Sequence, residues 1–270
     1  MGAPQGTKLS LWLWLVYVND IDPPCQLVKY ADDLTMFAFF NKTHNSEFYQ
    51  HALDCIDKWA TDNDMIINSK KSKVLHISLT KPKYTNEFTL GGEVIEICES
   101  SKLLGVILDN TLNFTEHVDD ICTRLASKLY GMRVLKRLGM NRKGLKTYYI
   151  ANIRPVLTYA SPAWTSLISD HNMQKIIQIE KSAMKIINSG ASYHDTLCEV
   201  NLSPLDVYIT ETGERYIRFI YDNEDHPLNP NIVRNNQRQT RVSSLTYMPR
   251  CRTSKLQNSF FHTYSDTISN

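Results

Sequence analysis

The apolar pattern of this chain changes near residue 110, and that change restricts the folds open to it. After Asp109, apolar residues recur every three or four positions, which places their side chains on one face of an α-helix. The residues in this series are Val118, Ile121, Cys122, Leu125, Leu129 and Met132. Further helices are predicted at about residues 143–158 and 172–188. The second part of the chain is therefore predicted to be helical.

Before residue 110 the pattern favours short strands with helices between them. An apolar stretch at residues 7–19 predicts a buried helix that ends at Asp22-Pro23-Pro24, because proline lacks the backbone donor. Asn45 or Ser46 is expected to cap the next helix. Strands are predicted at residues 66–67, 74–77, 88–90, 94–97 and 102–108. We therefore expect an α+β fold, with a domain boundary between residues 109 and 116.

Composition indicates a globular chain and excludes few functions. Of the 270 residues, 42% are hydrophobic and 21% are charged, and the net charge is only +2. Six cysteines without a Cys-x-x-Cys pair favour a reduced, intracellular protein. The apolar stretch near the N-terminus is too short to span a bilayer and lacks a cleavage site, so we expect a soluble, non-secreted chain with no membrane partner. Trp12, Trp14 and Trp59 are expected in the core.

Two adjacent acids, Asp32 and Asp33, lie between two runs rich in β-branched and aromatic residues. This pattern predicts strand, turn and strand. Neighbouring side chains on a strand face opposite ways, so two adjacent carboxylates converge on one cation only where a turn breaks the alternation. Such a pair suits Mg²⁺, which prefers oxygen ligands. An isolated Asp-Asp pair is more often a solvated turn, so the dipeptide alone does not decide between these interpretations.

Several motifs in order resemble the reverse transcriptase domain of non-LTR (LINE-type) retrotransposons. Residues 2–6 read Gly-Ala-Pro-Gln-Gly, matching that family's Gly-x-Pro-Gln-Gly loop, and residues 30–33 read Tyr-Ala-Asp-Asp, matching its polymerase signature. Residues 16–21, 67–72 and 103–109 are similar to three further motifs, and residues 159–164 and 176–187 to the helical region that follows the polymerase palm. The resemblance covers most of residues 1–190.

The resemblance implies a role for each matching residue. Asp32 and Asp33 would hold catalytic Mg²⁺, and Lys71, or Lys70 beside it, would approach the departing pyrophosphate. Residues near the template base and the incoming deoxynucleoside triphosphate would be Gly2, Pro4, Gln5, Gly6 and Tyr30. The strands that grip the primer would contain Leu104, Gly105 and Val106. The implied partners are an RNA template paired with a DNA primer, and deoxynucleoside triphosphates.

The charge distribution gives a separate indication of nucleic-acid binding. Residues 121–169 contain nine Arg or Lys residues and no Asp or Glu. Eight are assigned to the nucleic-acid backbone: Arg124, Lys128, Arg133, Lys136, Arg137, Arg142, Lys143 and Lys146. Tyrosines 130, 148, 149 and 159 lie among them and could stack on sugars or bases. A solubilising helix surface is the alternative, but such a surface usually mixes both signs of charge.

Together these features predict a partial polymerase palm at residues 1–110, with short antiparallel strands, and a helical, basic, thumb-like region at 111–190. Residues 191–270 are predicted to be a downstream region with a poorly ordered polar tail. In the reverse transcriptase family that this chain resembles, a further metal-binding Asp and the fingers precede the Gly-x-Pro-Gln-Gly loop. We therefore expect this chain alone not to polymerise. Two alternatives remain. One is a non-catalytic remnant that at most binds nucleic acid through its basic helices, and the other is a structural or untranslated pseudogene product that binds no ligand.

Overall fold

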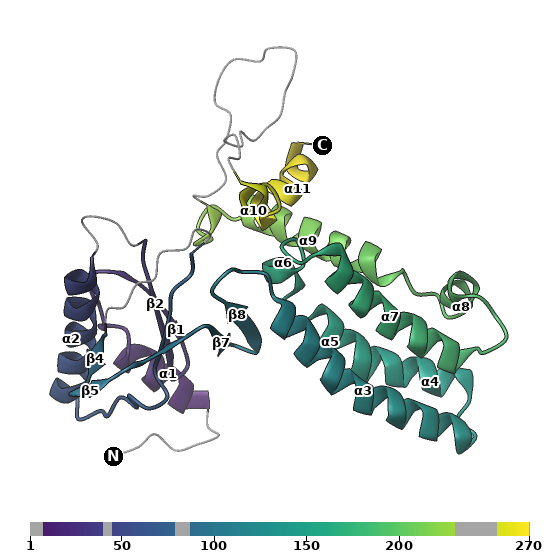
Figure 1. Ribbon diagram of the computed structural model, residues 1–270, viewed down its shortest axis with the longest axis horizontal. Helices are drawn as coiled ribbons and strands as arrows, with labels where there is room; N and C mark the ends of the chain where they lie inside the picture. Colours follow the sequence, from purple (N-terminus) through teal and green to yellow (C-terminus); the bar gives the residue numbers. More distant parts are fainter. Residues whose placement is uncertain (1–7, 40–44, 79–86, 230–252, 270) are drawn as a thin grey trace, which may run out of the picture. The chain divides into compact units, whose positions relative to one another are not determined.

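The computed structural model describes residues 8–39, 45–78, 87–229 and 253–269, and the chain divides into two compact units, residues 1–101 and 102–270 (Figure 1). The described residues combine helices with small two-stranded sheets, which confirms a mixed α and β composition. No helix in the described ranges combines the length and the apolar character needed to cross a membrane.

The first unit contains two helices and several very short strands. Its elements are α1 (Lys8–Tyr17), β1 (Gln26–Tyr30), β2 (Asp33–Phe37), α2 (Ser46–Asp62), β3 (Lys73–Leu75), β4 (Thr89–Leu90), β5 (Glu93–Val94) and β6 (Glu96–Cys98). The next strand, β7 (Ser100–Leu103), crosses the division between the units.

Helix α1 forms where the sequence predicts it, but the prediction that it is buried was wrong. Trp12 is 68% exposed and Val16 is 75% exposed, so Trp12 is not a core residue. Trp14 and Trp59 do pack, partly buried, against a small cluster formed by Val18, Ile21 and Ile56. Because the helix sequence is apolar on all sides, its pattern cannot show which side is covered.

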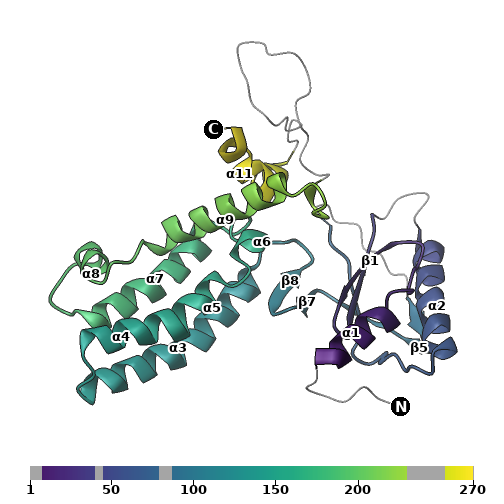
Figure 2. The same cartoon turned by 180° about the vertical axis from the view of Figure 1, so that it is seen from behind.

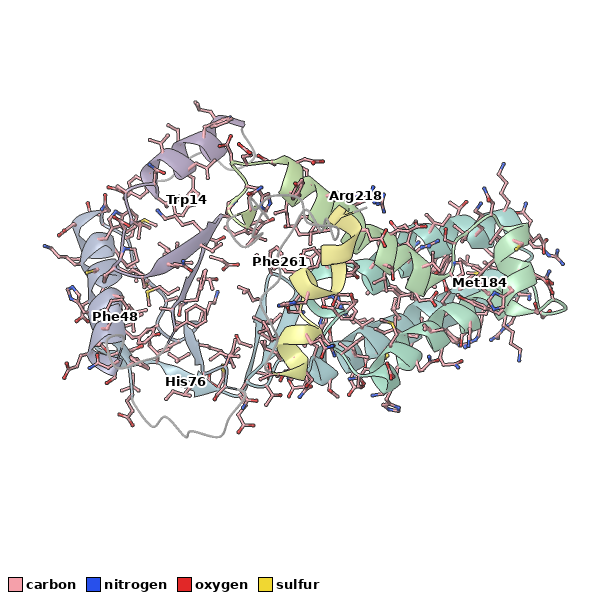
Figure 3. The ribbon with its side chains drawn as sticks, turned by 90° about the horizontal axis from the view of Figure 1, so that it is seen from above. Trp14, Phe48, His76, Met184, Arg218 and Phe261 are labelled. Carbon is pink, nitrogen blue, oxygen red and sulfur yellow. The ribbon has the colours of Figure 1, made fainter. Side chains whose placement is uncertain are left out.

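Helix α2 follows its predicted pattern closely. The Asn45 side chain accepts a hydrogen bond from the backbone N–H of Phe48, so Asn45 is the N-cap. Ala52, Ile56 and Ala60 are buried on one face (Figure 3 labels Phe48 at the start of this helix). The cap and the four-residue spacing together explain why this helix could be predicted from the sequence.

The strands of the first unit differ from the prediction in two places. Near the strands predicted at residues 88–90 and 94–97, β4 and β5 form a hairpin across Gly91-Gly92, with both glycines at positive φ. Residues 66–67, predicted as a strand, are not in one. Strand β3 pairs with β6 in parallel, so the expectation of antiparallel strands throughout was wrong. Parallel pairing joins segments distant in sequence, which a local pattern does not show.

The second unit is a helical assembly entered through a strand. Its elements are β8 (Val106–Asp109), α3 (Thr115–Arg137), α4 (Arg142–Tyr148), η1 (Tyr149–Ile153), α5 (Arg154–Thr158), α6 (Ser161–Trp164), α7 (Asp170–Ile187), α8 (Tyr193–Glu199), α9 (Leu205–Asp222), α10 (Ser254–Gln257) and α11 (Phe260–Ser269). Figures 1 and 2 both show α3 lying alongside α7 and α4. The amphipathic face predicted for α3 is confirmed, because Val118, Ile121, Leu125, Leu129 and Met132 are all buried.

The helix predicted at residues 143–158 forms as three continuous segments, α4, η1 and α5. The middle segment, η1, has the wider turn of a π-helix. It ends two residues before Pro155, the second residue of α5. Proline has no N–H to donate, and its ring crowds the preceding turn of a regular helix. The wider turn accommodates the proline without ending the helix.

The described residues after 191 form further helices that pack against the rest of the second unit. Helices α8 and α9 contribute buried residues such as Leu197, Leu205 and Ile209 to the main core. Helix α11 packs against α9, where Tyr264 contacts Ile217 and Ile220. Among the described residues, the polar sequence after residue 222 therefore includes a short helix, α11, which a few aromatic residues hold against α9.

Candidate functional site

The two adjacent acids lie at the end of a β-hairpin, as predicted. Strands β1 and β2 are antiparallel, and Tyr30 faces Asp33 across the ladder, so Ala31 and Asp32 form the turn. Ala31 has a φ of 51°, in the left-handed region. Both carboxylate residues are exposed. Because Asp32 is in the turn and Asp33 begins the strand, the alternation of strand side chains does not separate them.

Lys29, on the strand before this turn, links the hairpin to the end of α1. Its ammonium group donates to the backbone oxygens of Val18 and Asn19, at 2.8 and 3.0 Å. These carbonyls follow the last turn of α1, where a cation is favourable. A second link in the same unit joins the indole N–H of Trp59 to a carboxylate oxygen of Asp20, at 2.9 Å.

Lys70 and Lys71 lie in a separate turn of the first unit. The backbone N–H of Lys71 donates to the side-chain oxygen of Asn68, and both lysines are exposed. Among the described residues, no hydrogen bond or ion pair joins either lysine to Asp32 or Asp33. The residues assigned from the Gly-x-Pro-Gln-Gly loop, Gly2, Pro4, Gln5 and Gly6, lie outside the described residues.

The single strand predicted at residues 102–108 does not form. A tight turn at Leu104 and Gly105 interrupts it, and Val106 begins the next strand, β8. Leu104 and Gly105 connect β7 to β8, with φ values of 45° and 88°. Two successive positive φ values are the requirement of the commonest two-residue hairpin turn. Glycine meets this requirement at the second position, whereas Leu104 adopts it at a steric cost.

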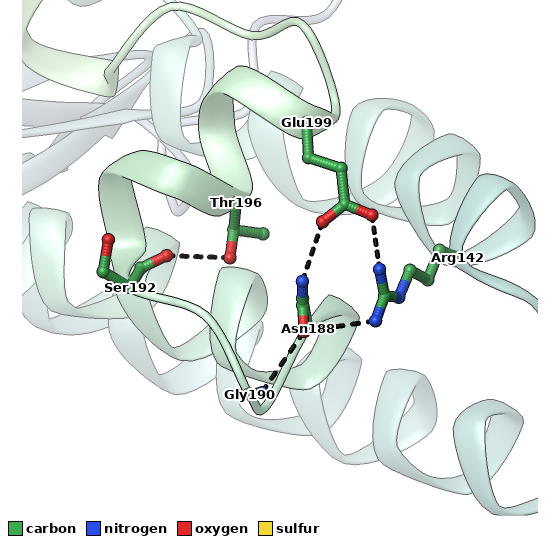
Figure 4. A network of polar contacts seen from close by, with 6 residues as sticks. All are labelled: Arg142, Asn188, Gly190, Ser192, Thr196 and Glu199. Carbon is green, nitrogen blue, oxygen red and sulfur yellow. Dashed lines mark hydrogen bonds and ion pairs between the residues drawn. The ribbon is translucent and has the colours of Figure 1, made fainter.

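Several of the predicted backbone-binding cations already have partners. Arg124 pairs with Asp120 at 3.0 Å, within α3. Arg142 pairs with Glu199 at 2.5 Å, and Asn188 bonds to both of them (Figure 4). The ninth cation, Arg154, is 8% exposed, donates to the backbone oxygen of Ser203, and lies over the ring of Tyr208. These three arginines therefore stabilise the helical unit.

The remaining cations have no carboxylate partner among the described residues and form what we call the basic cluster: Lys128, Arg133, Lys136, Arg137, Lys143 and Lys146. Arg133, Lys136 and Arg137 share a face of α3 by their spacing of three and four. Lys143 and Lys146 do the same on α4. The basic cluster thus retains the excess positive charge of the acid-free segment.

The tyrosines of this segment have different environments. Tyr130 is 60% exposed and Tyr159 is 54% exposed, so both rings are accessible. Tyr149 is fully buried, and its hydroxyl donates to Glu180 at 2.6 Å, so its predicted stacking role was wrong. Tyr149 lies on the inner side of the π-helical segment. The sequence, in which tyrosines lie among basic residues, does not show which tyrosine is buried.

Buried polar residues that the sequence did not single out hold the second unit together. Glu180, with no exposed surface, accepts hydrogen bonds from the hydroxyls of Tyr149 and Tyr193 and from the N–H of Leu205. Asp109, at the end of β8, accepts from Thr111, Asn113 and Phe114. Asp109 was visible only as the last residue of a motif, and Glu180 had no sequence signal beyond its place in an apolar helix face.

The described residues contain no group of three or more His, Cys, Asp or Glu side chains arranged to hold a metal ion. Asp32 and Asp33 therefore supply two carboxylates and no third protein ligand within those ranges. Two carboxylates still suit a magnesium ion, because Mg²⁺ retains water and binds substrate phosphates alongside one or two carboxylates.

Comparison with known proteins gives a direct family match. Residues 1–108 match the sequence model of the family described as reverse transcriptase (RNA-dependent DNA polymerase). The resemblance to reverse transcriptases is confirmed. The matched reverse transcriptase segment includes the Asp32–Asp33 turn and the Leu104–Gly105 turn, and it ends one residue before Asp109. Members of this family, as its description states, make DNA on RNA, and so act on nucleic acid and nucleotides.

The similar proteins come from mobile elements of flies. A probable RNA-directed DNA polymerase from transposon X-element of Drosophila melanogaster is 27% identical over 206 residues, covering 69% of this chain and 21% of that protein. The RNA-directed DNA polymerase from mobile element jockey of Drosophila funebris is 23% identical, covering 80% of this chain and 25% of that protein. Its Drosophila melanogaster counterpart is 24% identical, covering 72% and 22%.

These coverages add two facts about the chain. The similarity extends past residue 108, into the helices that the family model does not match. The chain spans about a fifth to a quarter of the length of these relatives. No solved structure matches the chain.

Proposed function

We propose that this chain is the part of a retrotransposon RNA-directed DNA polymerase that contains the Asp-Asp turn and the helices following the palm. The observation that carries the proposal is the exposed Asp32–Asp33 pair at a hairpin turn inside the segment that matches reverse transcriptases. On this proposal residues 1–110 belong to the palm, and the helices from α3 onward form a thumb-like region.

Asp32 and Asp33 would hold a divalent ion, Mg²⁺ by the chemistry of its ligands, through their carboxylate oxygens. When bound, such an ion helps to deprotonate a primer 3′-hydroxyl and neutralises charge on the phosphate being transferred. The carboxylates are exposed and have no hydrogen-bond partner among the described residues that would compete for their oxygens. They are therefore available to an incoming ion.

Other residues would position the substrates. Tyr30, 62% exposed beside the turn, would contact the nucleotide or template, and Lys71 would offer its ammonium group to the departing pyrophosphate. The turn at Leu104 and Gly105, followed by Val106, would contact the primer. The turn suits this role because Leu104 is 39% exposed at its tip.

The basic cluster supports a second, separable activity, the binding of nucleic-acid phosphates. Its six cations lie on two helices, in a stretch without acids between Asp120 and Asp170. Lys and Arg side chains without carboxylate partners attract phosphates and release the counterions condensed on a duplex. A chain that lacked polymerase activity could still bind an RNA–DNA duplex in this way.

The experiment that tests the polymerase proposal combines metal binding with primer extension. The chain with an RNA template, a DNA primer, deoxynucleoside triphosphates and Mg²⁺ is compared with Asp32→Asn and Asp33→Asn, and Mn²⁺ binding is measured on all three proteins. Asp62→Asn is the matched control, because Asp62 is an exposed carboxylate at the end of α2. We expect both turn variants, but not the control, to lose Mn²⁺ binding and any nucleotide addition.

Nucleotide addition or Mn²⁺ binding that survives both turn substitutions would contradict the catalytic assignment. Duplex binding without either activity would instead favour the non-catalytic alternative. The two outcomes are distinguishable because the basic cluster and the turn lie in different units of the chain.

A further inference from the structure

The turn that carries Asp32 is bonded directly to a side chain of α1. The indole N–H of Trp14 donates to the backbone oxygen of Ala31, at 2.7 Å. Ala31 immediately precedes Asp32 and has a φ of 51°. Figure 3 labels Trp14 on this helix.

This bond acts at the point where the turn is least favourable by itself. An alanine in the left-handed region is disfavoured, because its Cβ crowds the following carbonyl oxygen. A conformation of this kind persists where its surroundings determine it. The oxygen that Trp14 bonds belongs to the peptide plane joining Ala31 to Asp32. Fixing that plane fixes the N–Cα axis of Asp32, so only rotation about this bond remains to direct the Asp32 side chain.

The link between α1 and the hairpin runs in both directions. Trp14 donates from the helix to the hairpin turn, and Lys29 donates from the hairpin to Val18 and Asn19 after the helix. Two such links, at the turn and one residue before Tyr30, restrain both translation and twisting of the hairpin relative to α1. Neither link is needed for the β1–β2 ladder itself, which pairs Gln26 to Phe37 through Tyr30 to Asp33.

Packing alone does not account for Trp14. The ring contacts the cluster of Val18, Ile21 and Ile56, and a phenylalanine would fill much of that space. Of these two rings, only the indole offers an N–H donor to Ala31. The substitution Trp14→Phe therefore removes the N–H donor and keeps an apolar aromatic ring.

We propose that Trp14 is a positioning residue, which holds the Asp32–Asp33 turn in the geometry needed to bind a divalent ion. This inference rests on the proposed function for its catalytic meaning, because Trp14 acts through the backbone of Ala31 and does not contact the ion. It adds to that function a residue outside the Tyr-Ala-Asp-Asp motif.

The test compares Trp14→Phe with Trp59→Phe in the full chain. Trp59 is the matched control, since it packs on the same cluster and its indole N–H also makes one bond, to Asp20. Two readouts are taken on each protein: the NMR order parameters and the ¹⁵N shifts of the amides of residues 31–33, and the affinity for Mn²⁺ measured by relaxation enhancement. Thermal unfolding measures how much stability each substitution removes.

We expect Trp14→Phe to lower the order parameters at residues 31–33 and to weaken Mn²⁺ binding by roughly three- to tenfold, the size expected for one lost hydrogen bond. Trp59→Phe should change Mn²⁺ affinity by less than about twofold, even where its loss of thermal stability is similar. Rescue by Trp14→His, which restores a ring N–H, would strengthen the assignment.

Two results separate this inference from the proposed function. Turn amides and Mn²⁺ affinity that are unchanged in Trp14→Phe would overturn the positioning role, whatever the chain binds. A wild-type chain that binds no Mn²⁺ at Asp32 and Asp33, but whose turn loosens in Trp14→Phe, would contradict the proposed metal site. It would still support Trp14 as the residue that fixes the turn.

Discussion

Tyr264 occupies the space that a side chain at Gly213 would need. A Cβ atom built on Gly213 would lie 2.2 Å from the Cζ atom of Tyr264. Gly213 is in the middle of α9, where glycine is ordinarily less favourable than alanine by about 0.5–1 kcal/mol. Glycine is needed here despite that cost, because the missing Cβ lets α11 approach α9 closely.

Gly213→Ala is therefore expected to release α11 from α9, although alanine favours the helix itself. We expect the free energy of unfolding to fall by about 1–3 kcal/mol, the usual cost of overpacking, and limited proteolysis near α11 to become faster. In a Tyr264→Ala background the same change should instead stabilise by about 1 kcal/mol, because the clash is gone. Equal effects in the two backgrounds would contradict this packing.

The tyrosine and glutamate cluster predicts an alkaline limit to stability. Burial, and then the charge of Glu180 and its hydrogen bond, raise the pKa of Tyr149 well above its usual value. Burial, and then the hydrogen bond that Tyr193 donates to the other carboxylate oxygen of Glu180, raise the pKa of Tyr193. Since both folded-state pKa values are raised, these groups contribute stability below about pH 10, the ordinary tyrosine value, and lose it as the pH rises further.

This prediction is checked by ultraviolet titration of the tyrosines together with unfolding at pH 8–12. Tyr149 and Tyr193 should ionise only as the chain unfolds, because the pKa of each is raised in the folded state. Tyr149→Phe should destabilise by about 1–3 kcal/mol at pH 8 and flatten the alkaline loss. Ionisation of all tyrosines in one step, at a pH below that at which the chain unfolds, would show that the cluster does not protect Tyr149 and Tyr193.

Parts of this fold could be predicted because their signals are local. The cap at Asn45, the Gly91-Gly92 hairpin and the apolar spacing of α3 each depend on residues within a few positions of one another. The turn at Leu104 and Gly105 was missed, since Leu104 at positive φ leaves only one glycine to indicate it. The apolar residues on both sides of this turn, within 102–108, predict a single strand.

The candidate site was predictable to a similar extent. The Asp32–Asp33 turn followed from two acids between strand-like runs, and its proposed role from a family resemblance. The bond from Trp14 to Ala31 spans 17 positions, and the pairing of Arg142 with Glu199 spans 57. Neither can be read from a pattern, because each depends on how elements distant in sequence pack.

Asp109 predicts an acid limit to the stability of the second unit. Burial acts to raise the pKa of its carboxyl, but the hydrogen bonds from Thr111, Asn113 and Phe114 outweigh burial and leave the pKa below its usual value. Since the folded-state pKa is lowered, Asp109 contributes stability above about pH 4, the ordinary value for aspartate, and this is lost as the pH falls further.

We expect Asp109→Asn to reduce the free energy of unfolding by about 1–3 kcal/mol at pH 7, because the amide accepts these bonds more weakly than a carboxylate. The difference from the wild type should shrink as the pH falls below about 4, as the wild-type carboxyl becomes protonated. Asp170→Asn, at the exposed start of α7, is the control and should be nearly neutral. A difference that stays constant with pH would exclude this charge effect.

The basic cluster predicts a salt-dependent affinity for duplex nucleic acid, and Arg142 with Lys143 provides a test. These neighbours carry the same charge, but Arg142 is bound to Glu199 and Lys143 is exposed without a carboxylate partner among the described residues. Lys143→Ala should weaken binding of an RNA–DNA duplex and reduce the slope of log affinity against log salt by about 1, as for one lost phosphate contact.

Arg142→Ala should instead lower thermal stability, because Glu199 and Asn188 lose a shared partner, and leave the salt slope nearly unchanged. The triple variant Arg133→Ala, Lys136→Ala and Arg137→Ala should lower the slope by about 3 if all three contact phosphates. Salt titrations by fluorescence anisotropy, with circular dichroism to confirm folding, measure both effects. A larger slope change for Arg142→Ala than for Lys143→Ala would mean that the ion pair opens on binding, and that the phosphate-binding face includes α8.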